Sequence, residues 1–256
     1  MYNGALEYSS RMTAGRVRGG FNQYGFTVGI LMLDTRFPRI HGDMGNAGTF
    51  PFPVRYHRVA GAVPDLVVRR GAGGTLPAFV EGARALEREG VGAITTNCGF
   101  LVKYQRQLAA AVTVPVFTSS LLLVPLVYRM LAPGRRVGLM TVNASSLTPE
   151  HLAGAGIPAD LPLAVAGMEG EKEFTRVMLD DEMELDVDLA REEHVRVARR
   201  LVAAHPDIGA IVLECTNMPP YTADIQRETG RPVFDITTLV RMAHDALAGG
   251  RAPRPA

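Results

Sequence analysis

The only two cysteines of this chain occupy matching positions in two similar segments. The first segment reads Ala-Ile-Thr-Thr-Asn-Cys-Gly-Phe over residues 93–100, and the second reads Ala-Ile-Val-Leu-Glu-Cys-Thr-Asn over residues 210–217. Two equivalent thiols that face each other can act as a base on one side of a carbon atom and an acid on the other. Cys98 and Cys215 are therefore the first candidates for a chemical role.

The similarity continues downstream of both cysteines without a gap. The offset between them is 215 − 98 = 117 residues, and the same offset relates Tyr104 to Tyr221 and Pro115 to Pro232. An offset that is shared by a strand, a turn, a helix and a second strand predicts a duplicated half-domain.

Buried strands and amphipathic helices alternate along the chain. The pattern predicts strands at 28–33, 54–59, 91–96, 114–117, 136–141, 163–165, 210–213 and 232–234, and helices at 77–89, 100–111, 146–155, 188–204, 218–229 and 235–247. Such alternation is typical of parallel sheets that are covered by helices. The predicted fold is α/β, with two pseudo-symmetric lobes, each a parallel sheet flanked by helices, and an active site in the cleft between them.

The repeat also predicts where each lobe begins and ends. The first lobe spans residues 28–122 and is completed by a C-terminal helix at 238–250, and the second lobe spans 123–237. Residues 1–27 are rich in Arg, Gly and Ser and are interpreted as a leader or arm, and residues 251–256 as a frayed tail.

Each cysteine follows a predicted strand and precedes a predicted helix. Ligands of parallel sheets bind beyond the carboxyl ends of the strands, and a helix start stabilises a thiolate. The two cysteines also allow three other interpretations: small buried hydrophobic residues, a disulfide that would close the cleft, and a metal site. No C-x-x-C accompanies either thiol and the histidines show no metal spacing, so no metal site is predicted.

Polar side chains gather at the predicted strand ends, where each by itself is also a common cap or turn residue. The candidates for holding a substrate carboxylate are Asp34, Asn97, Thr141, Asn143, Thr216 and Asn217. The sequence leaves open whether Arg36, Arg55 and Lys172 are a charged clamp or surface charges. Glu214 precedes Cys215, but strand alternation points the two side chains apart, so a structural role stands beside a general-base role.

Composition excludes several classes of protein. The net charge of the 256-residue chain is +1, so no nucleic-acid partner is predicted. Residues 107–128 carry no charge, but prolines and a Thr-Ser-Ser triplet interrupt them, so no membrane partner is predicted either. Two cysteines give no disulfide framework, which indicates a reducing, cytoplasmic location. The glycines at 71–74 lack the spacing of a nucleotide site, and no cofactor is predicted.

These residues resemble the aspartate/glutamate racemase superfamily, which includes hydantoin racemases, maleate isomerases and arylmalonate decarboxylases. The likeness covers about residues 28–247 and rests on Thr-Asn-Cys at 96–98 and Glu-Cys-Thr-Asn at 214–217. It implies a cofactor-free enzyme in which two cysteines hold the substrate between them. Thr35 and Asn217 depart from the Ser and His that glutamate racemases have at these places, which argues against a strict glutamate racemase.

The function predicted on this basis is an isomerase: a cofactor-independent racemase or epimerase of an amino acid or related carboxylate. Cys98 and Cys215 would remove and return the α-proton, and the enzyme would form a homodimer or higher homo-oligomer. Two alternatives remain at this stage. One is a single-cysteine isomerase or decarboxylase of the same superfamily, and the other is a non-catalytic protein that binds a small acid.

Overall fold

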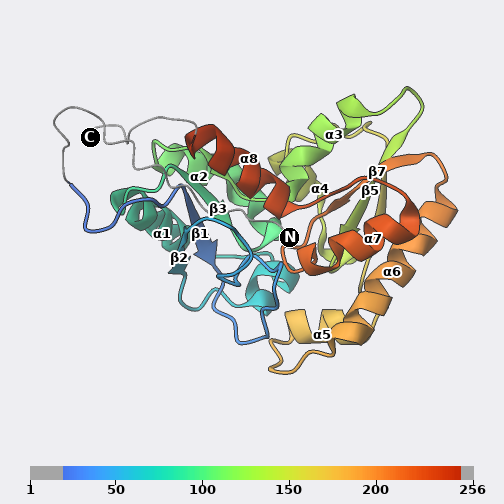
Figure 1. Ribbon diagram of the computed structural model, residues 1–256, viewed down its shortest axis with the longest axis horizontal. Helices are drawn as coiled ribbons and strands as arrows, with labels where there is room; N and C mark the ends of the chain where they lie inside the picture. The colour runs from blue at the N-terminus through green and yellow to red at the C-terminus, as the bar shows by residue number, and fades with distance from the viewer. Residues whose placement is uncertain (1–19, 249–256) are drawn as a thin grey trace, which may run out of the picture.

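The computed structural model describes residues 20–248, and in it the chain forms two lobes that lie side by side (Figure 1). Most of the predicted leader and all of the predicted tail fall outside these residues. Each lobe is built on a four-stranded parallel sheet. The first sheet has the strands β1 (Val28–Met32), β2 (Val54–Arg58), β3 (Ala93–Thr96) and β4 (Val116–Phe117), and the second has β5 (Arg136–Thr141), β6 (Leu163–Gly167), β7 (Ile208–Leu213) and β8 (Val233–Phe234).

The two sheets have the same topology and the same register. Their strand orders are β2-β1-β3-β4 and β6-β5-β7-β8. Ile94 pairs with Val116 in the first sheet, and Ile211 pairs with Val233 in the second. Both pairs differ by the sequence offset, because 94 + 117 = 211 and 116 + 117 = 233. The predicted fold of two pseudo-symmetric α/β lobes is confirmed.

The helices cover both faces of the sheets, as buried parallel strands require. They are α1 (Leu76–Arg88), α2 (Gln105–Ala111), α3 (Val124–Met130), α4 (Pro149–Gly154), α5 (Glu173–Leu179), α6 (Val187–Ala204), α7 (Thr222–Thr229) and α8 (Ile236–Ala248). Short helical turns precede several of them, including η2 (Gly99–Tyr104) directly after Cys98 and η5 (Pro219–Tyr221) before α7.

Two helices lie on the sheet of the opposite half. α3, at the end of the first half of the sequence, packs on β5, whereas α8 packs on β1 (Figure 1). The offset places residue 124, the first of α3, at 124 + 117 = 241, inside α8. The halves therefore exchange equivalent helices, and this exchange ties the two lobes together.

The sequence pattern missed α5, a helix of seven residues. Its start is stabilised by Glu193 of α6, whose carboxylate accepts the main-chain N–H groups of Lys172, Glu173 and Phe174 at 2.8–3.0 Å. A cap supplied from twenty residues away leaves no local signature, because the usual capping residue is the one that precedes the helix.

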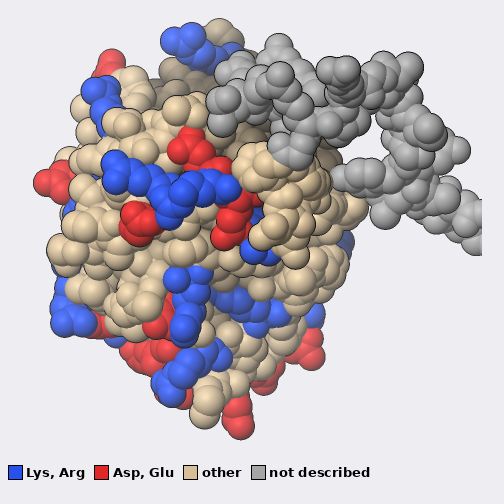
Figure 2. All heavy atoms as spheres, turned by 90° about the vertical axis from the view of Figure 1, so that its left-hand side faces the viewer, with Lys and Arg blue, Asp and Glu red and all other residues tan. Residues whose placement is uncertain are grey.

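The surface carries mixed charge. Figure 2 shows the outer face of the first lobe, on which Lys and Arg side chains are interspersed with Asp and Glu. Within residues 20–248, no helix combines the length and the apolar character that a membrane crossing would need.

Candidate active site

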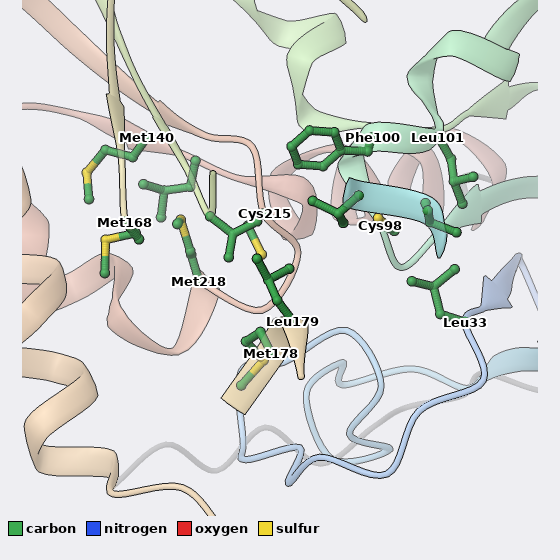
Figure 3. Close-up of a cluster of buried hydrophobic side chains, with 14 of the residues drawn as sticks. Leu33, Cys98, Phe100, Leu101, Met140, Met168, Met178, Leu179, Cys215 and Met218 are labelled. Atoms are coloured by element: carbon green, nitrogen blue, oxygen red, sulfur yellow. The ribbon is translucent and has the colours of Figure 1, made fainter. Parts of the chain in front are cut away.

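Both thiols line one cavity at the carboxyl ends of β3 and β7. Cys98 and Cys215 are each 8% exposed. Figure 3 shows Cys98 beside Phe100 and Leu33 from the first lobe, and Cys215 beside Met178 and Leu179 of α5. The full lining is Leu33, Phe37, Pro64, Val68, Asn97, Cys98, Gly99, Phe100, Val142, Met178, Leu179, Glu214, Cys215, Thr216 and Asn217. The duplicated sequence thus brings its two cysteines together between the lobes.

The cavity is small and mostly apolar. Its volume is about 30 Å³, which is room for ordered water rather than for a carboxylic acid. Neither Lys nor Arg is among its lining residues. The loop after α5 closes it from one side: the Asp181 carboxylate accepts the main-chain N–H of Arg36 at 2.6 Å and that of Phe37 at 3.2 Å. Entry of a substrate therefore requires the lobes to separate at this contact.

Two reciprocal contacts cross between the lobes beside the thiols. Thr216 donates its hydroxyl hydrogen to the main-chain oxygen of Asn97. The offset relates residue 97 to 214 and residue 99 to 216, so the equivalent contact joins Gly99 to Glu214. Gly99 does pack there, since a Cβ at this glycine would overlap both the carboxyl group and the main-chain oxygen of Glu214. The pseudo-twofold axis of the molecule therefore runs between the two cysteines.

Glu214 is a fully buried carboxyl group with half of its hydrogen-bonding capacity unused. Its Oε2 accepts the Thr141 hydroxyl at 2.7 Å, whereas its buried Oε1 has no partner. Burial raises the pKa of Glu214 to about 7, and the Thr141 hydrogen bond opposes only part of this shift. Strand alternation predicted a side chain directed away from that of Cys215, yet Glu214 belongs to the lining of the same cavity.

The thiols are harder to ionise than the sequence predicted. Burial and the nearby Glu214 carboxylate raise the pKa of Cys98 to about 12, and the same two causes raise the pKa of Cys215 well above its usual value. The N–H groups of Phe100 and Leu101 lower the Cys98 pKa, as a helix start should, but burial outweighs them. The expectation of thiolates stabilised by helix starts is therefore wrong for this closed structure. Burial disfavours the charged thiolate by more than the two N–H hydrogen bonds stabilise it.

The predicted carboxylate-binding residues fall into two groups. Asn97, Thr216 and Asn217 line the cavity, and Thr141 lies behind it, hydrogen-bonded to Glu214. Asp34 and Asn143 are outside the lining. The first pairs with Arg58 at 3.1 Å and accepts the Gly61 N–H at 3.0 Å, and the second caps a turn by accepting the Ser146 N–H at 3.1 Å.

The residues left open by the sequence lie elsewhere. Arg36 is exposed and pairs with Asp181 at 3.3 Å, and Arg55 pairs with Glu89 on the outer side of the first lobe. Lys172 is not in the cavity lining. Sequence reasoning missed Met178 and Leu179 because it missed α5. It missed Phe37 because that residue belongs to a long loop without periodicity.

The described part of the chain, residues 20–248, contains no group of three or more His, Cys, Asp or Glu side chains that could hold a metal ion. The ionisable groups in the cavity lining are the two thiols and the Glu214 carboxyl.

Residues 68–243 match the sequence profile of Asp/Glu/hydantoin racemases. The chain belongs to this family. The match spans both cysteines, β3, β4 and the whole second sheet, so the resemblance inferred from the repeated Cys motif is confirmed, and this racemase-family chain is an enzyme.

Curated relatives of this family member carry a different activity in their names. A dimethylsulfoniopropionate lyase of Durusdinium sp. clade D is 31% identical over 219 residues, which cover 82% of this chain and 71% of that protein. Dimethylsulfoniopropionate lyase 6 of Emiliania huxleyi is 32% identical over 225 residues, which cover 83% of this chain but only 57% of that protein. This chain therefore spans little more than half the length of the second relative.

Solved structures share the racemase-family fold with this chain. The crystal structure of an arylmalonate decarboxylase aligns over 89% of this chain and 96% of that one, with a TM-score of 0.55 and 18% identity. An aspartate racemase of Picrophilus torridus aligns over 88% and 95%, with a TM-score of 0.56 and 14% identity. One fold thus carries a decarboxylase and a racemase, so the reaction must be argued from the site.

Proposed function

We propose that this racemase-family chain is a lyase that cleaves a small carboxylate bearing a sulfonium group, with dimethylsulfoniopropionate as the expected substrate. The observation that carries the proposal is the identity of 31% and 32% to proteins named dimethylsulfoniopropionate lyases. The isomerase predicted from the sequence is kept as the second candidate, because two thiols in one cavity suit a two-base exchange of the α-proton.

The electrostatics of the cavity favour a cationic substrate over an acidic amino acid. Aspartate or glutamate would bring a second carboxylate, and the lining offers no Lys or Arg to receive it. The unpaired buried carboxyl of Glu214 instead suits a cation. A sulfonium group carries no N–H or O–H, so it gains from such a charge without needing a hydrogen-bond acceptor.

A cationic substrate also supports ionisation of the base. A positive charge within a few ångströms favours the charged form of a thiol, which offsets the burial that keeps Cys98 and Cys215 protonated. The thiolate then forms when substrate is bound and the cavity is closed. Apolar walls from Phe37, Met178 and Leu179 accommodate the methyl groups of the substrate.

The reaction is an elimination in which atoms and electrons balance. A thiolate removes the proton from the carbon next to the carboxylate, and the electron pair of that C–H bond becomes the second bond of a C=C double bond. The C–S bond breaks, its electrons stay on sulfur, and neutral dimethyl sulfide departs from acrylate. The thiol afterwards releases its proton to solvent. Asn97 holds the substrate carboxylate in this proposal, which is supported by its oxygen accepting the Leu33 N–H at 2.7 Å, so that its own N–H groups face the substrate.

One experiment separates the candidates. The purified protein, treated with a chelator, is incubated with dimethylsulfoniopropionate in D₂O, and dimethyl sulfide and acrylate are quantified. Release of both in equal amounts is expected. A panel of amino acids and hydantoins is followed in parallel by chiral chromatography and by deuterium at Cα. Exchange at Cα without cleavage would establish the racemase instead, CO₂ release would establish a decarboxylase, and tight binding without turnover would establish a binding protein.

A further inference from the structure

A loop of the first lobe makes an ordered set of polar contacts with the segment that carries Cys215. The loop joins β1 to β2, and its Asp43 is only 2% exposed although it is a carboxylate. Gly42 lies against Pro220 of η5, and a Cβ at this glycine would be 2.9 Å from the Pro220 Cα. The tight approach of the two backbones brings Asp43 to the second lobe.

The Asp43 carboxylate is fully engaged. Oδ1 accepts Arg39 Nη1 at 2.8 Å and the Gly45 N–H at 2.7 Å, and Oδ2 accepts Asn217 Nδ2 at 2.6 Å. Arg39 is itself held by the Thr35 hydroxyl at 2.8 Å. A carboxylate held by a largely buried guanidinium and by two further N–H donors has a fixed geometry.

These contacts determine which way the Asn217 amide faces. A carboxylate can only accept hydrogen bonds, so Asn217 must present its NH₂ group to Asp43. The amide oxygen is then the end that faces Cys215, and Cys215 Sγ donates to Asn217 Oδ1 at 3.6 Å. The chain of contacts runs from Arg39 through Asp43 and Asn217 to the thiol.

We propose that Asp43 is a positioning residue for Cys215, acting from the first lobe through the Asn217 amide to fix the direction in which this thiol carries its proton. This inference rests on the proposed function in one respect only: it takes Cys215 as a group that reacts with the substrate. It assigns a chemical purpose to the loop at residues 42–46.

The groups around Cys215 make the effect of Asp43 measurable. The charged or ionisable groups that raise the Cys215 pKa are Glu214, Cys98 and Asp43, and the Asn217 N–H lowers it. Asp43 reaches Cys215 through the Asn217 amide, whereas the charged groups that shift the Cys98 pKa are Glu214 and Arg39. Loss of the Asp43 charge should therefore ease ionisation of one thiol and leave the other unchanged.

The test is the variant Asp43→Asn, with Asp207→Asn as the matched control. Asp207 also pairs with an arginine, Arg136, at 2.7 Å, but it lies before β7 at the opposite end of the sheet. Iodoacetamide labelling of each thiol is followed by peptide mapping between pH 7 and 10. For Asp43→Asn we expect Cys215 to react roughly three- to tenfold faster at pH 8, since loss of the nearby negative charge lowers the Cys215 pKa and a more acidic thiol is more ionised but less nucleophilic. Cys98 should stay within twofold, and Asp207→Asn should change neither.

A second readout is independent of labelling. If dimethylsulfoniopropionate is cleaved, Asp43→Asn should lower kcat about tenfold or more with KM within about threefold, because orientation rather than binding is lost. Faster labelling of Cys215 with unchanged labelling of Cys98, together with slower turnover, is a signature that unfolding does not give, because unfolding would expose both buried thiols. In the Cys215→Ser background, Asp43→Asn should have no further effect on turnover or on Cys98 labelling.

Three outcomes would overturn the proposal: unchanged Cys215 labelling, equal acceleration of both thiols, or additive losses in the Cys215→Ser background. If Asp43→Asn does not fold, the double variant Arg39→Gln/Asp43→Asn removes both charges together, and its ratio of Cys215 to Cys98 labelling must still exceed that of the wild type. The labelling readout needs no substrate, so absence of lyase activity in the wild-type protein would contradict the proposed function and leave this test intact.

Discussion

Cys98 and Cys215 occupy equivalent positions in the two halves, but the side chains that surround them differ in polarity. In each half, the second residue after the cysteine contacts the segment between the first and second strands of the other half, which is a loop at Asp43 and helix α4 at His151. Phe100 is covered by His151, whose ring lies edge-on at 5.1 Å, and Asn217 is bound by Asp43 at 2.6 Å. The same docking is therefore apolar beside Cys98 and ionic beside Cys215.

The close approach of the two backbones between the lobes also occurs in both halves. Gly42 lies against Pro220, and Gly154 lies against Val102 and Lys103, whose position in the second half is 103 + 117 = 220. The two halves therefore place their thiols at equivalent positions, but different residues surround each thiol. The difference suggests that the two thiols have unequal roles, as a lyase needs one base and a racemase needs two matched ones.

The largest expected effect comes from removing the thiols one at a time. We expect Cys215→Ser to lower kcat/KM about 10²- to 10⁴-fold, because a hydroxyl is a far weaker acid than a thiol and proton transfer contributes about this much, and we expect Cys98→Ser to cost less. Equal losses in the two variants would favour the two-base racemase. The measurement is cleavage of dimethylsulfoniopropionate, with circular dichroism to confirm the fold. A variant with near wild-type turnover would show that its half of the cavity is only structural.

Glu214 is the next strongest point of asymmetry, since the offset places the neutral Asn97 at the equivalent position. Burial raises its pKa in the folded protein from 4.5 to about 7, so the folded state holds a proton that the unfolded state releases. Stability should therefore fall as pH rises from about 4.5 to 7, by about 3 kcal/mol in total, and stay low above that range.

Glu214→Gln tests this sign. The variant should lack the loss of stability between pH 4.5 and 7, and both of its thiols should react faster with iodoacetamide above pH 7, where the wild-type carboxylate opposes their ionisation. Urea unfolding at several pH values measures the first effect. The exposed Glu150→Gln serves as control, and a parallel pH slope in Glu214→Gln and wild type would contradict the assignment.

Gly99→Ala probes the crossed contacts. Its equivalent, Thr216, tolerates a side chain, whereas a Cβ at residue 99 would overlap Glu214, including its main-chain oxygen. Overpacking of this kind costs about 1–3 kcal/mol, and for a chain of this size each kcal/mol lowers Tm by about 2–4 °C. Gly73→Ala, with no atom near its Cβ, is the matched control in thermal unfolding. Equal Tm values for the two variants would mean that the Gly99 contact yields at little cost.

The smallest expected effect is at the contact that closes the cavity. Asp181→Ala removes the acceptor for the Arg36 and Phe37 N–H groups, so both thiols should be labelled roughly two- to fivefold faster. Asp180→Ala removes only an exposed ion pair with Arg69 and should change labelling little. Acceleration of one thiol alone would show that this loop acts on one lobe and does not gate the cavity.

The sequence by itself determined the architecture and the pair of thiols. Continuous apolar runs such as Val28–Met32 and Ile208–Leu213 form strands buried on both faces, because a parallel sheet covered by helices leaves no polar side. The repeated offset of 117 carried the register of β3 with β4 and of β7 with β8. Asn97, Thr216 and Asn217 were found for the same reason, since residues just after such strands must lie at one edge.

Tertiary structure alone decided how the thiols behave and which residues surround them. α5 depends on a cap from Glu193, so Met178 and Leu179 could not be placed in the cavity by local pattern. The thiol pKa values depend on burial and on Glu214, quantities that exist only once the lobes meet. Asp34 and Asp43 belong to the same loop region, yet the first pairs with Arg58 at the surface and the second with Asn217 beside Cys215. The two side chains differ because the backbone beside Asp43 packs on the opposite lobe, whereas Asp34 is bound within its own lobe. Spacing along the sequence does not reveal this packing.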